Sequence, residues 1–183
     1  RHYAMAAKVP MLEPADSMEA YTFAKNAFEL SEKYDTPVLL RMCTRIAHSQ
    51  SIVETSEKVL ATLKDYEKNP SKYIMTPANA IKRHPFVEER TLKLQEFAEN
   101  CEYNTVEMNS DEIGIITSGC SYQYVKEVMG DSASVLKIGM SYPLPVNLIK
   151  DFASKVKTLY VIEELDPFIE NHVKALGIDC IGK

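Results

Sequence analysis

The sequence predicts an α/β protein, made of a partial βαβ lobe followed by a parallel, doubly wound sheet. In residues 11–42, an amphipathic stretch separates two short apolar runs. In residues 111–183, three apolar runs alternate with three amphipathic stretches, which is the pattern of consecutive strand–helix units. The composition, 45% hydrophobic and 26% charged over 183 residues, is ordinary for a globular protein.

The first lobe begins with a short strand at residues 11–14. Asp16 or Ser17 is expected to cap the helix that follows, and Glu19 lies in its first turn, near the positive end of the helix dipole. Residues 38–42 then read as a buried strand. Because two strands cannot bury both faces of a sheet, we expect this unit to be the end of a larger α/β domain.

The middle of the chain, residues 48–110, is predicted to be a linker with a long helix. Its first part is rich in polar residues and prolines and has little periodicity. Residues 86–104 form an amphipathic helix. The expected apolar positions of that helix are Phe86, Leu92, Leu94, Phe97 and Ala98.

The last part, residues 111–183, starts with a strand that ends near Ser118 and a helix that follows it. Two further strand–helix units complete the predicted sheet. In the final helix, Pro167 falls in the first turn and Gly177 comes just after the end. Residues 178–182 could start one more strand.

Charge and hydropathy exclude several classes of protein. The net charge is -5 and no basic stripe is present, so we expect no nucleic-acid partner. No apolar run approaches the roughly 20 residues that span a bilayer, and no signal peptide is visible, so we expect no membrane association. The chain starts at Arg1 rather than at a methionine, and we therefore expect a piece of a longer protein.

The cysteines are far apart in the sequence and form no CxxC pair. This spacing argues against a zinc knuckle or an iron–sulfur ligand set within the chain, and no metal site is predicted. We expect reduced thiols in a cytoplasmic protein. The four cysteines are Cys43, Cys101, Cys120 and Cys180.

The turn Ser118, Gly119, Cys120 and Ser121 joins a predicted strand to a predicted helix. Such a turn can present a nucleophile, bind an anion at the helix N-terminus or pack against an interface. The glycines of a dinucleotide-binding motif are missing. His172 is the only histidine in this lobe, and it lies on a polar helix face. The helix dipole is expected to lower the pKa of Cys120 and make its thiol reactive to reagents.

Two further groups lie at the same predicted edge of the sheet. Glu163 and Glu164 end a strand, where paired acids can transfer protons or bind a basic partner, and Asp166 is expected to cap the next helix. Tyr142 and Pro143 suggest a rigid protein interface.

Basic residues offer weaker candidates for an anion site. Arg41 and Arg45 flank the end of the second strand of the first lobe. Arg1, His2 and Tyr3 lie together at the start of the chain.

The segments "ITSGCSYQYVKEV" and "LYVIEELDPFIE" resemble the α subunits of the indolepyruvate:ferredoxin oxidoreductases. "RHYAMAAKVPMLEPADSMEAY" and "TPVLLRMCTRIAHSQS" resemble them in the same order, and the match is weaker from about Val53 to Asn109. These subunits belong to the thiamine-diphosphate-dependent 2-oxoacid:ferredoxin oxidoreductases, many from anaerobes.

The resemblance implies a function for the complete protein. It would oxidatively decarboxylate aryl pyruvates such as indolepyruvate to acyl-CoA, using thiamine diphosphate, Mg²⁺ and iron–sulfur clusters. Its partners would be a β subunit, a second α subunit, ferredoxin as electron acceptor, and coenzyme A as substrate. Residues 1–47 would be the end of a pyrimidine-binding-like domain, and residues 111–183 would resemble the C-terminal domain of transketolase.

The sequence departs from the family's pattern in what it lacks. The GDG…Asn motif for thiamine diphosphate is absent, and the cofactor-activating glutamate and the iron–sulfur cysteines would lie outside the chain. No catalytic residue can therefore be carried over, although Arg1, His2 and Tyr3 would lie near the substrate loop. We expect a structural piece that binds no cofactor and is inactive alone.

Two alternatives remain open from the residues. One is a stand-alone module that binds a nucleotide-like anion or coenzyme A at the Ser118–Ser121 turn. The other is a cysteine hydrolase that uses Cys120.

Overall fold

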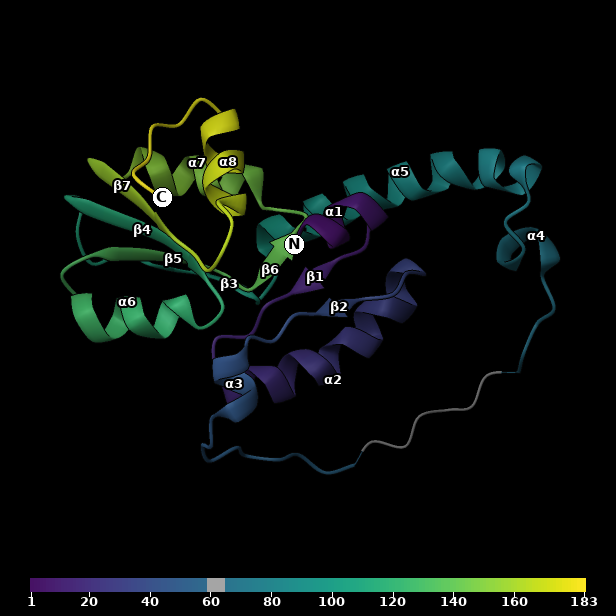
Figure 1. Ribbon diagram of the computed structural model, residues 1–183, viewed down its shortest axis with the longest axis horizontal. Helices are drawn as coiled ribbons and strands as arrows, with labels where there is room; N and C mark the ends of the chain where they lie inside the picture. Colours follow the sequence, from purple (N-terminus) through teal and green to yellow (C-terminus); the bar gives the residue numbers. More distant parts are fainter. Residues whose placement is uncertain (59–64) are drawn as a thin grey trace.

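The computed structural model describes residues 1–58 and 65–183, which form two sheets with helices packed around them (Figure 1). The helices are α1 (His2–Ala7), α2 (Ser17–Tyr34), α3 (Thr44–His48), α4 (Pro70–Tyr73), α5 (Pro77–Asn100), α6 (Ser121–Met129), α7 (Val146–Ser154) and α8 (Phe168–Ala175). The strands are β1 (Met11–Leu12), β2 (Leu39–Leu40), β3 (Asn104–Glu107), β4 (Ile113–Ser118), β5 (Ser134–Ile138), β6 (Met140–Tyr142) and β7 (Thr158–Ile162).

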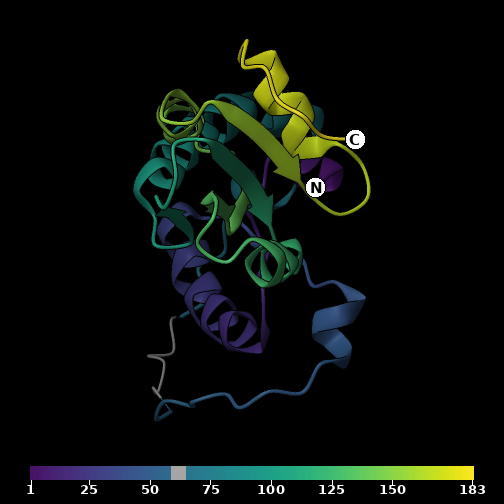
Figure 2. The same ribbon diagram turned by 90° about the vertical axis from the view of Figure 1, so that its left-hand side faces the viewer.

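The larger sheet has the strand order β3-β5-β4-β7. Strand β4 pairs in parallel with β5 on one side and with β7 on the other, so the direction of chain progression reverses at β4. Helix α6 covers one face, whereas α7 and α8 cover the other (Figures 1 and 2). The predicted α/β fold with a parallel, doubly wound sheet is confirmed.

Alternation along β4 explains why both faces are covered. Ile115 packs with Val125 of α6, whereas its neighbour Ile116 packs with Phe152 of α7 and Ile169 of α8. Successive side chains of a strand point to opposite faces, so a continuous apolar run requires a helix on each side.

An antiparallel edge strand, β3, was not predicted. Residues 101–104 were expected to end a helix, but that helix stops at Asn100 and Asn104 begins β3. The Asn104 side chain accepts backbone N–H bonds from Gly139 and Met140, each at 3.0 Å. These contacts to a distant segment hold the strand where helical periodicity alone would continue.

The smaller sheet has the strand order β2-β1-β6. β1 and β2 pair in parallel, as expected for a strand–helix–strand unit. β6, from the second half of the chain, pairs antiparallel with β1 and completes this sheet. The predicted burial of residues 38–42 is wrong: β2 is a two-residue strand at the edge of the sheet, and Leu39 is 36% exposed.

Helix α2 begins as the sequence indicates. Asp16 accepts a hydrogen bond from the Glu19 backbone N–H at 2.8 Å, and the Glu19 carboxylate accepts one from the Ala15 N–H at 2.8 Å. This reciprocal pair satisfies two backbone donors that the helix start leaves free. The helix ends at Asp35, which adopts a left-handed conformation.

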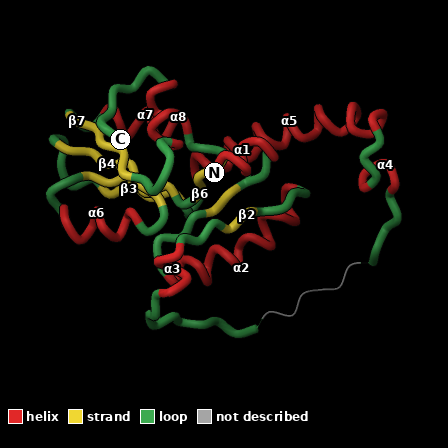
Figure 3. The backbone as a smooth tube through the Cα atoms, in the orientation of Figure 1, coloured by secondary structure: helices red, strands yellow, loops and turns green. Residues whose placement is uncertain are grey.

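Helix α5 starts earlier than predicted, at Pro77 rather than residue 86. Thr76 caps it, Pro77 occupies the first turn, and Pro85 lies within the helix rather than before it. Much of α5 extends away from both sheets (Figures 1 and 3). For that reason Leu92 and Phe86 are exposed, contrary to expectation. Leu94 and Ala98 are buried as predicted, and Phe97 is half-buried.

Across the residues that the structure describes, no helix combines the length and apolarity needed to cross a bilayer.

Candidate functional site

The candidate site lies where the strand order of the larger sheet reverses, at the carboxyl ends of β4 and β7. In open α/β sheets this is the position of the ligand-binding crevice. Ser118 ends β4, and Glu163 directly follows β7. The chain after β1 and β2 of the smaller sheet reaches the same place and contributes Glu13 and Arg41.

The Arg1 guanidinium is the centre of the site. It binds Glu13 through two hydrogen bonds, Nε–Oε1 at 2.6 Å and Nη2–Oε2 at 3.0 Å. Its Nη1 donates to Glu163 Oε2 at 2.6 Å and to the Glu164 carbonyl oxygen at 3.3 Å, and its Nη2 donates to Ser118 Oγ at 2.8 Å. The side chains of Arg1, Glu13 and Glu163 are 5%, 1% and 1% exposed.

The opposite charges of Arg1 and Glu13 shift the pKa of each group toward its ionised form. Burial alone would raise the pKa of Glu13, but the hydrogen bonds and charge of Arg1 outweigh it and hold that pKa below its usual value. Burial alone would also lower the pKa of Arg1, but Glu13 and Glu163 outweigh it and raise that pKa. Arg41 adds a second cation, with its Nη1 2.9 Å from Glu13 Oε2 and 3.7 Å from Glu164 Oε2.

Gly119 allows the β4–α6 turn to approach this cluster. Its φ of 55° lies in the left-handed region, where a residue with a side chain would have a strained backbone. A Cβ at this position would lie 3.5 Å from Glu13 Oε2. The glycine therefore serves the turn and its close contact with Glu13.

Glu163, rather than Asp166, caps α8. The backbone N–H groups of Ile169 and Glu170 donate to the two Glu163 carboxylate oxygens, each at 3.0 Å. The prediction for Asp166 is wrong: its side chain is 81% exposed and has the His2 imidazole 3.8 Å away. A buried carboxylate reaches the helix start from the preceding strand end, so the residue next to Pro167 is not needed as a cap.

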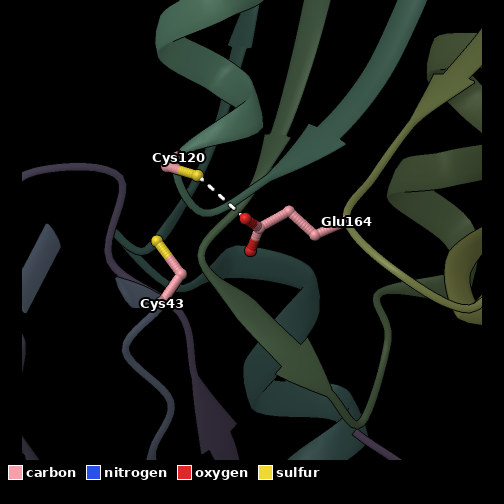
Figure 4. Close-up of side chains that lie close together, drawn as sticks. All are labelled: Cys43, Cys120 and Glu164. Atoms are coloured by element: carbon pink, nitrogen blue, oxygen red, sulfur yellow. Dashed lines mark hydrogen bonds between the residues drawn. The ribbon is translucent and has the colours of Figure 1, made fainter. Parts of the chain in front are cut away.

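Cys120 lies beside the charged cluster. Its thiol donates a hydrogen bond to Glu164 Oε1 at 3.2 Å, and the Cys43 thiol lies close by (Figure 4). Burial, followed by the hydrogen bonds with Cys43 and Glu164, raises the pKa of Cys120 to about 12. The expected lowering by the helix dipole is therefore wrong. His172, the histidine considered as a partner for a Cys120 nucleophile, forms a hydrogen bond between its Nδ1 and the Phe168 carbonyl oxygen at 2.7 Å.

The remaining predicted residues lie around this centre or away from it. Ser121 is buried at the start of α6, and Pro143 is buried after β6. Tyr142 is half-buried and pairs with Met11 across the smaller sheet. His2 packs edge-on against Phe168, with ring centroids 5.3 Å apart. Tyr3 is 87% exposed, and Arg45 lies 6.0 Å from the Tyr124 ring.

The structure thus brings together Arg1, Ser118, Gly119, Cys120, Glu163 and Glu164. Two members were missed, Glu13 and Cys43. A signal for both was present, because Glu13 lies near the end of the predicted strand at residues 11–14 and Cys43 directly follows the predicted strand at residues 38–42. Parallel strands end at the same edge, so residues that follow them are brought together.

The site does not fit thiamine diphosphate with its metal ion or an iron–sulfur cluster. Arg1 and Arg41 are already paired with carboxylates, so the negative charges of the site would repel a diphosphate. A cubane or binuclear cluster uses four ligands, mostly cysteines. In the described part of the chain, only Cys43 and Cys120 reach this site, and Cys101 lies in a separate apolar core.

No family model matches the chain. Over its whole length the chain is 38% identical to the indolepyruvate oxidoreductase subunit IorA of Archaeoglobus fulgidus and to that of Methanothermobacter thermautotrophicus. It spans 30% and 32% of the length of these two relatives.

Among solved structures, the 2-oxoglutarate:ferredoxin oxidoreductase of Magnetococcus marinus aligns with a TM-score of 0.61 and 19% identity. The alignment covers 95% of this chain and 38% of that one, and it shows a shared fold. A split-gene transketolase aligns with a TM-score of 0.48 and 13% identity, below the level at which a fold can be inferred. The resemblance to the indolepyruvate oxidoreductase α subunits is confirmed: along its whole length the chain is homologous to about three tenths of an IorA subunit.

Proposed function

We propose that this chain is part of an oxidoreductase subunit that acts on indolepyruvate, and that it joins two α/β lobes of that subunit. The observation that carries the proposal is the 38% identity to IorA subunits over the whole chain. The Arg1-centred cluster supports the joining role. It connects Glu13, which follows β1 of the smaller sheet, to Glu163, which follows β7 of the larger one.

In the complete protein we propose the oxidative decarboxylation of an aryl pyruvate. The 2-oxoacid anion and coenzyme A would give acyl-CoA, carbon dioxide and one proton, and the two electrons released would reduce ferredoxin. A β subunit and a second α subunit would complete the assembly in the cytoplasm. Thiamine diphosphate with Mg²⁺ would supply the decarboxylation chemistry and iron–sulfur clusters the electron transfer, each held by residues other than those of this chain.

For this chain itself we propose a positioning role rather than a catalytic one. Residues 1–47 would be the end of the pyrimidine-binding-like domain, residues 48–110 a linker with a long helix, and residues 111–183 the transketolase-C-like domain. The polar groups of the Arg1 cluster bind one another, which suits a rigid support. The same charges disfavour the alternative of an anion at the Ser118–Ser121 turn, because Glu13, Glu163 and Glu164 would repel the phosphates of coenzyme A.

A chimera tests the proposal. The homologous three tenths of Archaeoglobus fulgidus IorA is replaced by this chain, and the protein is produced together with its partner subunit. We expect indolepyruvate-dependent reduction of ferredoxin in the presence of coenzyme A. The same chimera carrying Glu13→Gln should lose activity together with stability.

Two results would contradict the proposal. One is a folded, cofactor-loaded chimera that does not oxidise indolepyruvate. The other is decarboxylation of indolepyruvate by this chain alone, supplied with thiamine diphosphate and Mg²⁺, because that would place the cofactor site within the chain.

A further inference from the structure

Three possible metal ligands from three separate segments meet at the edge of the Arg1 cluster. Cys43 follows β2, Cys120 lies in the turn between β4 and α6, and Glu164 follows β7. The two sulfur atoms and a carboxylate oxygen all lie within 4.8 Å of one another. Figure 4 shows the two thiols and the carboxylate facing a common space between the segments.

Two thiols and one carboxylate form a donor set that thiophilic divalent cations prefer, and Mg²⁺ and Ca²⁺ do not. In a tetrahedral zinc site, bonds of about 2.3 Å to sulfur and about 2.0–2.2 Å to oxygen place the ligand atoms roughly 3.5–3.8 Å apart. In this structure the three ligand atoms lie within 4.8 Å of one another, and Cys120 Sγ is 3.2 Å from Glu164 Oε1. Small side-chain rotations would complete the geometry.

We propose that Cys43, Cys120 and Glu164 bind one thiophilic divalent cation such as Zn²⁺, with a water molecule as the fourth ligand. Cys120 is buried, whereas Cys43 and Glu164 are half-buried. Because Cys43 and Glu164 are partly exposed, an ion can reach these ligands from solvent. Nothing in the similarity to IorA or to the solved structures assigns such a site, and the proposal does not depend on the proposed function.

The binding step balances in protons and charge. Two S–H bonds break, two metal–sulfur bonds form, and two protons pass to solvent as one doubly charged ion enters. The net charge of the site therefore does not change. Glu164 Oε1 exchanges its hydrogen bond from Cys120 for a bond to the metal, while Glu164 Oε2 stays 3.7 Å from Arg41. An arginine beside the distal oxygen is the kind of outer contact that orients a ligating carboxylate.

The ion would act as a second connection between the sheets. Cys43 comes from the smaller sheet, and Cys120 and Glu164 come from the larger one. Bound metal would thus stabilise the junction that the Arg1 cluster also spans, through atoms that this cluster does not use.

The test is a metal titration of the whole chain, reduced and metal-free, with Co²⁺ and Zn²⁺ alone. We expect one Co²⁺ per chain, a sulfur-to-cobalt charge-transfer band of the size that two thiolates give, and displacement of Co²⁺ by Zn²⁺. Cys43→Ser and Cys120→Ser should each lose about half of the band or more. Each should weaken Zn²⁺ binding at least as much as the loss of an outer contact does, about 10–100-fold.

Cys180→Ser is the matched control, because Cys180 is also half-buried but lies outside the cluster. It should leave the stoichiometry, band and affinity unchanged. If a cysteine variant does not fold, Glu164→Gln keeps both sulfur atoms, and it should weaken Zn²⁺ binding while retaining the charge-transfer band. The proposal is overturned if the reduced wild-type chain shows no thiolate band, if Cys180→Ser has the same effect as Cys43→Ser, or if Glu164→Gln binds Zn²⁺ as the wild type does.

Discussion

The two sheets of this protein are built from similar sequence patterns but differ in how completely they are covered. In the four-stranded sheet, every residue of β5 is buried, and helices lie on both faces. In the three-stranded sheet, β1 and β2 have two residues each, Leu39 is partly exposed, and Phe28 of the neighbouring helix α2 is 76% exposed. The four-stranded sheet has a complete apolar core, whereas the three-stranded sheet has one open side.

This difference shows what holds the smaller sheet in place. Its inner side shares the core of Leu12, Phe23, Leu94 and Met140, which includes a strand from the second half of the chain. Its end is fixed by the Arg1 cluster. We infer that the paired ions of this cluster favour one arrangement of the two sheets, because separating them would leave a charge unpaired in the interior. We infer that the junction relies on charge where the larger sheet relies on apolar packing.

The largest expected effect comes from breaking the charged junction. Glu13→Gln removes the carboxylate that binds both Arg1 and Arg41, and it should lower the free energy of unfolding by about 3–5 kcal/mol. Urea denaturation measures this. Glu89→Gln, which breaks an exposed pair with Lys93, is the control and should change stability by less than about 1 kcal/mol. Equal losses of stability in the two variants would show that the buried junction contributes no more than an exposed ion pair.

A pair of truncations compares the two sheets directly. Leu136→Ala, in the centre of the larger sheet, should cost about 2–5 kcal/mol because it leaves a cavity in a closed core. Leu39→Ala, on the open edge, should cost less than about 1 kcal/mol because its side chain already contacts solvent. Similar costs in thermal unfolding would mean that the smaller sheet is covered as completely as the larger one.

A smaller effect should separate the two candidate caps of α8. Glu163→Gln removes a charged acceptor from two backbone N–H groups and from Arg1, and it should cost about 1.5–3 kcal/mol. Asp166→Asn changes an exposed side chain and should stay within about 0.5 kcal/mol. If the Asp166 variant proved the less stable one, the cap would belong to Asp166 as the sequence had indicated.

The smallest expected effect is the loss of stability at acidic pH when Glu13 becomes protonated. The pKa of Glu13 is lower in the folded chain than the ordinary value of 4.5, so its contribution to stability is fully present above pH 4.5. That contribution decreases as the pH falls through the folded pKa and protonates Glu13. The wild type should therefore lose more stability than Glu13→Gln below pH 4.5, measured as the urea midpoint. Parallel curves for the two proteins would contradict the assignment.

The sequence was informative where local pattern and tertiary structure agree. The apolar run of β4 and the helix after it require each other, so the order of strands and helices after residue 111 could be read directly. It failed where a distant contact decides. β3 depends on Asn104 meeting Gly139, and α5 accommodates Pro85, which by local rules ends a helix.

The candidate site shows the same limit. Ser118, Glu163 and Glu164 were found because strand ends mark a crevice. Glu13 and Cys43 were missed because their roles depend on two sheets meeting. The strand ends of the βαβ unit indicate that Glu13 and Cys43 lie at one edge, but the meeting of that edge with the larger sheet depends on β6 pairing with β1 across more than half of the chain.

The central claim is that Arg1 couples the two sheets through Glu13 and Glu163, and a double-mutant cycle tests it most directly. The free energies of unfolding of the wild type, Glu13→Gln, Glu163→Gln and the double variant are measured under one condition. Because both carboxylates bind one guanidinium, we expect a coupling energy within the range of about 0.5–3 kcal/mol that contacting residues show. Effects that add within about 0.3–0.5 kcal/mol, as for independent sites, would contradict the claim that one buried cluster joins the sheets.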